Sequence, residues 1–174
     1  FEEEVKKFLG LTDRETVAVS TGHAALHLGL MLAGVGPGDQ VITPSFNNIA
    51  DFQAILAVGA EPVFCDIADD SLCLDLEKAG DLVSARTKAL IAMDYDCMLC
   101  EHDEVAAFAE KHRLRVIHDA AHAFGSQHRG RMVGSFSDIC MFSFDPVKTI
   151  TCIDGGMLVV RSGEERQRLP EMRL

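Results

Sequence analysis

Short apolar runs alternate with helical segments along almost the whole chain, and this alternation constrains the fold more than any other feature of the sequence. Apolar runs of strand length predict strands over residues 16–19, 40–43, 62–66, 87–93, 114–118, 138–143 and 156–161, with a further short extended piece at 131–133. Helical spacing and capping residues predict helices over residues 1–8, 24–33, 48–58, 76–83 and 103–112. Strands separated by helices throughout favour right-handed crossovers. The sequence therefore predicts an α/β fold of three layers, α/β/α, with a mainly parallel mixed sheet covered on both faces.

Length and charge narrow the class of protein further. A chain of 174 residues, 48% hydrophobic and 25% charged, has the size and composition of one globular domain. Its net charge of −11 argues against nucleic acid or an anionic membrane as the main partner, since neither attracts an acidic protein at long range. No apolar run is long enough to span a membrane, and the N-terminus lacks the charge pattern of a signal peptide, so a cytoplasmic location is expected.

The six cysteines lie mostly in apolar surroundings, which predicts reduced thiols in the core. Cys97 and Cys100 form a C-x-x-C, which could be redox-active or half of a zinc site. No second C-x-x-C or spaced histidine pair accompanies them, so chance spacing is the better interpretation and no metal is expected.

The last residues, 164–174, have the pattern of a helix that is just beginning. Its apolar residues, Leu169, Met172 and Leu174, would need something to pack against. We therefore expect the chain to be a piece of a longer protein.

Polar residues follow several of the predicted strands, and ligands of open parallel sheets bind at such strand ends. Asp119 ends an apolar strand, where a buried carboxylate needs a cationic or hydrogen-bonding partner. A pyridinium nitrogen would be such a partner, whereas the alternative is a structural aspartate that caps residues 120–123. His122 could face the same ligand or pack under the sheet.

Lys148 follows an apolar, proline-containing stretch, where desolvation would lower its pKa and make the amine a nucleophile toward an aldehyde. The alternative is a surface lysine after Pro146. Gly22 and His23 open a helix whose free N–H groups suit a phosphate, unless they form an ordinary N-terminal turn. Ser143 could give a hydroxyl to the same phosphate.

Five segments in the same order carry a resemblance to a known family. The segments are STGHAALHL (20–28), GVGPGDQVITPSF (34–46), VGAEPVFCDI (58–67), VIHDAAHAFGS (116–126), and FSFDPVK (142–148) with DGGM (154–157). The chain resembles, over nearly its whole length, the DegT/DnrJ/StrS family of pyridoxal-phosphate-dependent sugar aminotransferases, which have the aspartate-aminotransferase type of fold. The resemblance implies that residues 1–174 are the large cofactor-binding domain of fold type I, without the smaller C-terminal domain that follows it in the family.

Site roles follow from the resemblance, position by position. Lys148 is expected to form the Schiff base with pyridoxal 5′-phosphate and to move the proton between the substrate carbon and the cofactor. Asp119 would pair with the pyridine nitrogen, and His122 would lie next to the phenolic oxygen. Gly22 and His23 fall on the phosphate cup, and Ser143 on the serine that binds the phosphate.

The chain departs from the family at several positions of this site. His23 replaces a threonine or serine, and Asn48 stands where an aromatic side chain stacks on the cofactor ring. The remaining departures are two replaced glycines and one replaced proline, at Cys97, Ile153 and Leu99.

The resemblance also implies a reaction and partners. The family moves an amino group, usually from glutamate or glutamine, onto a keto group of a nucleotide-linked sugar, as a homodimer, in polysaccharide or antibiotic sugar biosynthesis. The piece alone is expected to bind cofactor weakly and to turn over little or no substrate. A non-catalytic protein of the same fold remains an alternative. A sugar dehydratase is another, although the family's dehydratases carry histidine in place of Lys148. A dinucleotide enzyme is the least favoured, because no G-x-G-x-x-G follows a predicted strand.

Overall fold

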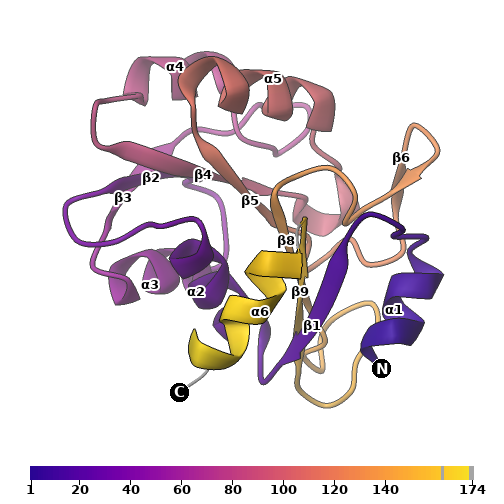
Figure 1. Ribbon diagram of the computed structural model, residues 1–174. Helices are drawn as coiled ribbons and strands as arrows, with labels where there is room; N and C mark the ends of the chain where they lie inside the picture. The colour runs from indigo at the N-terminus through magenta and orange to yellow at the C-terminus, as the bar shows by residue number, and fades with distance from the viewer. Residues whose placement is uncertain (162, 173–174) are drawn as a thin grey trace.

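Seven strands form the central sheet of the computed structural model, which describes residues 1–161 and 163–172 (Figure 1). The strands are β1 (Glu15–Val19), β2 (Gln40–Pro44), β3 (Glu61–Cys65), β4 (Thr87–Met93), β5 (Arg115–Asp119), β8 (Ile139–Ser143) and β9 (Gly156–Val160). Their order across the sheet is β1-β9-β8-β5-β4-β2-β3. Each corresponds to a predicted apolar run, so the expected α/β class is confirmed.

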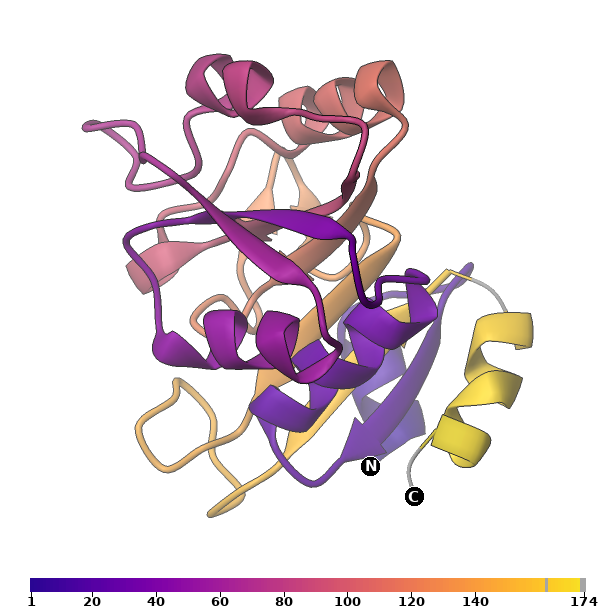
Figure 2. The same ribbon diagram turned by 90° about the vertical axis from the view of Figure 1, so that its left-hand side faces the viewer.

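Within the described residues, six α-helices cover the sheet on both faces. They are α1 (Glu2–Phe8), α2 (Gly22–Leu32), α3 (Ile49–Ala57), α4 (Leu76–Leu82), α5 (His102–His112) and α6 (Gly163–Met172). Figure 2 shows α4 and α5 on one side of the strands and α2 and α3 on the other. Successive side chains of a strand point to opposite faces, so β8 sends Ile139 and Met141 toward α2, and Cys140 and Phe142 toward α1. The chain therefore has the three layers predicted for it. Among the described residues, none of the helices is long and apolar enough to cross a membrane.

The sheet is mixed because β9 runs antiparallel to both of its neighbours, β1 and β8. Antiparallel strands need no crossover helix, and β8 connects to β9 through a loop, residues 144–155. The step from β5 to β8 also lacks a helix and carries instead the small pair β6 (Gln127–His128) and β7 (Arg131–Met132). The expectation of helices between all strands was therefore wrong at these two connections, and the strand at 127–128 was not predicted.

The last helix packs onto the core. Leu169 is fully buried in the cluster that also contains Leu28 and Val160, and Met172 packs against the same cluster. These two side chains therefore have the packing partners that the sequence called for within the chain itself, and the expectation of a longer protein stays a prediction. Leu174 lies outside the described residues.

The cysteines divide into two groups, and all six are free thiols. Four are buried, as predicted: Cys65, Cys73, Cys100 and Cys140. Cys97 and Cys152 are exposed. The sulfurs of the C-x-x-C point to different places, because Cys97 Sγ donates to the carbonyl of His122 and Cys100 Sγ to that of Met93. The two thiols thus face different parts of the fold.

Candidate active site

A cavity of about 300 Å³ lies at the carboxyl ends of β4, β5 and β8. Most of the predicted site residues line it: Gly22, His23, Asn48, Asp119, Ser143 and Lys148. His122 is the one predicted residue that does not. Residues that lie far apart in the sequence therefore meet in one place, at the edge of the sheet where ligands of such folds bind.

The first turn of α2 forms one wall of the cavity. Thr21 caps the helix, with its hydroxyl accepting a hydrogen bond from the N–H of Ala24 at 2.9 Å, so the helix begins at Gly22, two residues earlier than predicted. A Cβ on Gly22 would lie 2.7 Å from Ser143 Cβ and 2.9 Å from Ser143 Oγ. Because glycine has no side chain, the start of the helix can pack directly against the end of β8. The positive end of the helix dipole and the serine hydroxyl then face the same space, an arrangement that suits an anion such as phosphate.

Asp119 ends β5 and is only 3% exposed. Its Oδ1 accepts a hydrogen bond from the N–H of Ala121 at 2.9 Å, so the residue caps the following turn and faces the cavity at the same time. The two interpretations of this aspartate are therefore compatible. A largely desolvated carboxylate at this place would pair favourably with a cationic ring nitrogen.

Lys148 lies on the loop between β8 and β9. A turn holds its backbone, with its N–H donating to the carbonyl of Asp145 at 3.0 Å. The side chain is half-buried, and in the part of the chain that the structure describes Nζ makes no hydrogen bond or ion pair. The apolar neighbours Val147 and Ile150 are exposed, so they do not enclose the amine. The desolvation expected for this lysine stays a prediction.

His122 lies beside the cavity. Its Nδ1 accepts a hydrogen bond from the N–H of Asp96 at 3.1 Å, which leaves Nε2 to carry the proton. Burial lowers the pKa of His122, and the charge of Lys148 lowers it further, although Asp119 and Asp96 act in the opposite direction. The ring is therefore neutral near pH 7 and has one N–H to donate. It also meets Tyr95, with ring centroids 5.4 Å apart.

Asn48 acts as a helix cap in this structure. It precedes α3, and its Oδ1 accepts a hydrogen bond from the N–H of Ala50 at 2.9 Å. The sequence predicted the cap, and the structure adds that the residue is exposed and borders the cavity. An aromatic pair that the sequence did not suggest lies in the same region, Phe46 with Tyr95, at a centroid distance of 4.7 Å.

Two of the departures from the family occupy left-handed backbone. Cys97 has φ of 63° and Ile153 has φ of 77°, and each replaces a residue that is usually glycine in the family. Non-glycine residues are disfavoured in this region because Cβ crowds the backbone. Leu99, which replaces the proline, is partly buried and packs against the core cluster beside α1.

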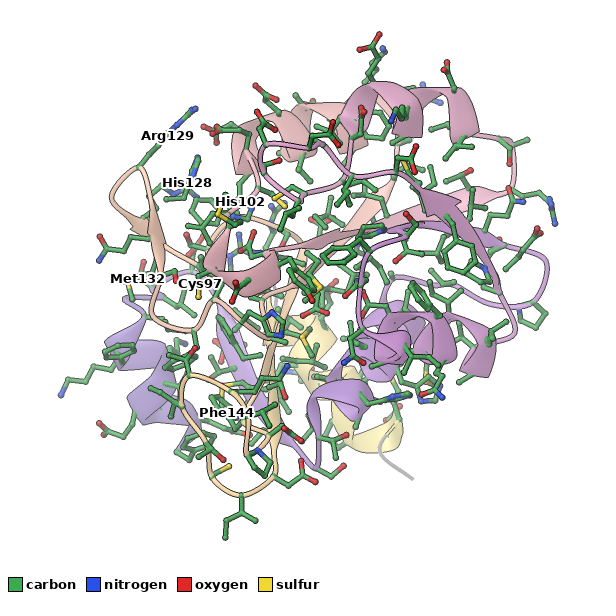
Figure 3. The ribbon with its side chains drawn as sticks, turned by 180° about the vertical axis from the view of Figure 1, so that it is seen from behind. Cys97, His102, His128, Arg129, Met132 and Phe144 are labelled. Carbon is green, nitrogen blue, oxygen red and sulfur yellow. The ribbon has the colours of Figure 1, made fainter. Side chains whose placement is uncertain are left out.

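A second polar cluster lies beneath the site, on the face covered by α5. His118 Nε2 lies 2.7 Å from Asp94 Oδ2, and His102 Nε2 lies 3.5 Å from the same oxygen. His102 in turn lies beside His128 of the small strand pair, with ring centroids 5.4 Å apart (Figure 3). Asp94 also accepts a hydrogen bond from the N–H of Cys100 and donates its own N–H to the carbonyl of Asp119. The contacts of this cluster therefore connect the ends of β4 and β5.

Burial and neighbouring charges together determine the protonation states of Asp94, His118 and His102. Burial alone would raise the pKa of Asp94, but the two histidines hold it well below its usual range. Burial alone would lower the pKa of His118, but Asp94 raises it well above its usual value. Burial lowers the pKa of His102, which keeps that ring neutral. The three ligand atoms lie within 4.8 Å of one another and could meet a metal ion, but the short contact shows a direct, hydrogen-bonded ion pair between Asp94 and His118.

Comparison with known proteins identifies the chain's relatives. The model of the DegT/DnrJ/EryC1/StrS aminotransferase family matches residues 1–174. The spore coat polysaccharide biosynthesis protein SpsC of Bacillus subtilis (strain 168) is 38% identical over 164 residues, which are 94% of this chain and 42% of SpsC.

Two solved structures show the same fold. DesV of S. venezuelae is 36% identical, with a TM-score of 0.92 over 99% of this chain and 46% of DesV. The PLP form of the putative sugar aminotransferase Spr1654 of Streptococcus pneumoniae is 29% identical, with a TM-score of 0.88 over 99% of this chain and 47% of Spr1654. The chain thus spans less than half the length of these relatives. The resemblance noted in the sequence is confirmed: the chain belongs to the DegT/DnrJ/EryC1/StrS aminotransferase family.

Proposed function

We propose that this chain is the cofactor-binding part of a pyridoxal-phosphate-dependent aminotransferase, which transfers an amino group from glutamate or glutamine to the keto group of a nucleotide-linked sugar. One observation carries the proposal. A helix N-terminus, a serine hydroxyl, a desolvated carboxylate and a lysine with no hydrogen bond or ion pair among the described residues line a single cavity of about 300 Å³. Family membership supports the same reaction class.

The residues present fit pyridoxal phosphate at each of its functional groups. The start of α2 and the hydroxyl of Ser143 suit the phosphate, and the absence of a Cβ at Gly22 keeps these two elements in contact. Asp119 suits a protonated ring nitrogen, and the amine of Lys148 suits the aldehyde. When bound, the cofactor supplies a reactive aldehyde and a ring that withdraws electrons from the substrate carbon.

The remaining chemistry belongs to the side chains. Lys148 would act as the nucleophile toward the cofactor and then take and return a proton at the substrate carbon. Asp119 would keep the ring nitrogen protonated, because a buried carboxylate favours a cation beside it. His122, neutral and carrying a proton on Nε2, would donate a hydrogen bond at the edge of the cavity.

Substrate recognition is proposed to involve more than this chain. The loop that carries Lys148 exposes two large apolar side chains, Val147 at 84% and Ile153 at 82%. We infer that another segment or a second copy in a homodimer covers this loop and completes the surface for the sugar nucleotide and the amino-acid donor. A cytoplasmic location is part of the same proposal.

Chemical trapping tests the role of Lys148. The full-length protein is mixed with pyridoxal phosphate, reduced with borohydride, digested and analysed by mass spectrometry. We expect the cofactor on the peptide containing Lys148, and no fixed cofactor in Lys148→Ala. Lys111→Ala is the matched control, since it removes an exposed lysine of α5 away from the cavity. Equal fixation in Lys148→Ala and wild type would contradict the assignment.

Amino transfer is then measured directly. Nitrogen-labelled glutamate or glutamine is incubated with a panel of keto sugar nucleotides, and the products are analysed by mass spectrometry. A labelled amino sugar nucleotide that forms with wild type and not with Lys148→Ala is the expected result. Cofactor fixed on Lys148 without transfer to any member of the panel would instead favour a binding protein of the same fold.

A further inference from the structure

A second carboxyl group lies behind Asp119 and has no role in the site described so far. Asp51 belongs to the first turn of α3 and is fully buried, on the same face of the helix as Ala54 and Ile55. The side-chain amide of Asn47 donates a hydrogen bond to its Oδ2. Among the described residues no donor reaches Oδ1. An ionised carboxylate here would keep one buried oxygen without a hydrogen-bond partner, which costs free energy.

The acidic group that acts on Asp51 is the carboxyl of Asp119. The carboxyl groups of Asp51 and Asp119 lie within hydrogen-bonding reach of each other, and two buried carboxyl groups this close favour sharing one proton, because ionising both places two negative charges side by side. Burial raises the pKa of Asp51 well above its usual range, and the charge of Asp119 raises it further.

The surroundings decide which of the two acids holds the proton. Asp119 faces the cavity with Lys148, and its carboxylate accepts the N–H of Ala121. Asp119 therefore has a backbone donor for one oxygen, whereas Oδ1 of Asp51 has none among the described residues. Asp51 lies outside the cavity lining, and within the described part of the chain Asp119 is the charged group that acts on it.

We propose that Asp51 is a protonated positioning residue, which donates a hydrogen bond from Oδ1 to the carboxylate of Asp119 and so fixes the orientation of Asp119 toward the ring nitrogen of bound pyridoxal phosphate. This inference rests on the proposed function. With that bond, Asn47, Asp51 and Asp119 would form a chain of hydrogen bonds from the loop before α3 to the end of β5. The start of α3 would thus set the angle of the carboxylate that the cofactor meets.

The first experiment locates the proton without any cofactor. The free energy of unfolding of the cofactor-free full-length protein is measured by urea titration from pH 4 to pH 8 for wild type, Asp51→Asn and the exposed control Asp81→Asn of α4. A carboxyl whose pKa is raised on folding binds more protons in the folded state, so its contribution to stability is complete below the unfolded pKa of about 4 and is lost as pH rises toward the folded value. Asp51→Asn keeps the size and a hydrogen-bond donor but cannot ionise.

The expected result is a steeper loss of stability with rising pH in wild type and Asp81→Asn than in Asp51→Asn. The ratio of the unfolding constants of wild type and Asp51→Asn should grow by up to about tenfold for each pH unit between the two pKa values. Equal slopes for wild type and Asp51→Asn would overturn the assignment of the proton to Asp51.

The second experiment measures the dissociation constant of pyridoxal phosphate. Asp51→Leu keeps the branched shape of the side chain and loses the donor, so we expect binding about tenfold weaker or more, the usual loss for a hydrogen bond to a charged group. Asp51→Asn, which can still donate to Asp119, should rescue most of this affinity. Wild-type affinity in Asp51→Leu would overturn the positioning role. If wild type itself binds no cofactor, the proposed function fails together with that role, while the pH experiment still decides the state of the carboxyl pair.

Discussion

Replacing Gly22 with alanine tests the contact on which the phosphate-binding wall of the cavity depends. The added Cβ would lie 2.7 Å from Ser143 Cβ, 2.9 Å from Ser143 Oγ and 3.1 Å from Met141 Cε. Carbon atoms in contact prefer separations of about 3.5–4.0 Å, so the methyl group overlaps two neighbours at once. Ser143 Cβ is attached directly to the backbone of β8, so it cannot rotate away from the added methyl group. We therefore expect α2 and β8 to move apart.

The size of the effect follows from two opposing contributions. Overpacking of a well-packed core costs about 1–3 kcal/mol. Alanine in place of glycine favours a helix by up to about 1 kcal/mol, and by less in the first turn. The net expectation for Gly22→Ala is a loss of about 1–2 kcal/mol in the free energy of unfolding. Because the displaced pair would hold the phosphate, affinity for pyridoxal phosphate should fall by a larger factor than the unfolding constant changes.

Urea unfolding and cofactor titration measure the two effects. Gly36→Ala is the matched control, since no atom lies within 4 Å of the Cβ it would add. It should leave both quantities close to those of wild type. A Gly22→Ala protein that is as stable as wild type and binds the cofactor equally well would refute the argument from close approach.

Two further perturbations test other parts of the structure. His118→Ala leaves Asp94 buried without its ion-pair partner and should cost about 3–5 kcal/mol of stability in urea unfolding near pH 6. The pKa of His118 is raised in the folded state, so its contribution to stability is complete below the unfolded pKa of about 6.5 and is lost as pH rises. The difference in unfolding free energy between wild type and His118→Ala should therefore shrink in alkaline buffer. An unchanged difference would argue against a charged histidine. Cys97→Gly and Ile153→Gly should each raise stability by up to about 1 kcal/mol, since glycine relieves the left-handed backbone at φ of 63° and 77°. A thermal melt checks this, and a destabilised glycine variant would show that the cysteine or isoleucine side chain matters more than the backbone.

The sequence was sufficient where local pattern and position decide the outcome. Strand runs, caps and glycine turns are local signals, so the strands of the main sheet were predicted to within a residue or two. The site was predictable because Asp119 and Ser143 end strands, and strand ends of one sheet converge. The family resemblance added the roles of these residues, which no pattern of polarity could supply.

The sequence was insufficient where distant segments meet. The antiparallel direction of β9 depends on which strands it joins, and its apolar run reads the same in either direction. Asp51 could have been noticed as an acid on the buried face of a predicted helix, but only the fold places it against Asp119. The ion pair of Asp94 and His118 likewise joins the ends of two strands separated by a whole crossover.

The loop between β8 and β9 gives the site two parts of different architecture. Ser143 pairs with Gly156, and the N–H of Phe144 donates to the carbonyl of Gly155 at 2.9 Å, so the loop is closed at its base by the sheet itself. Everything that would recognise the cofactor's phosphate and ring nitrogen belongs to strand ends and a helix start, whereas the amine is carried by the closed loop. Exchanging this loop between relatives, with Ser143 and Gly156 kept as its two ends, could therefore change the placement of the reacting amine. The residues that would bind the phosphate and the ring nitrogen would stay the same.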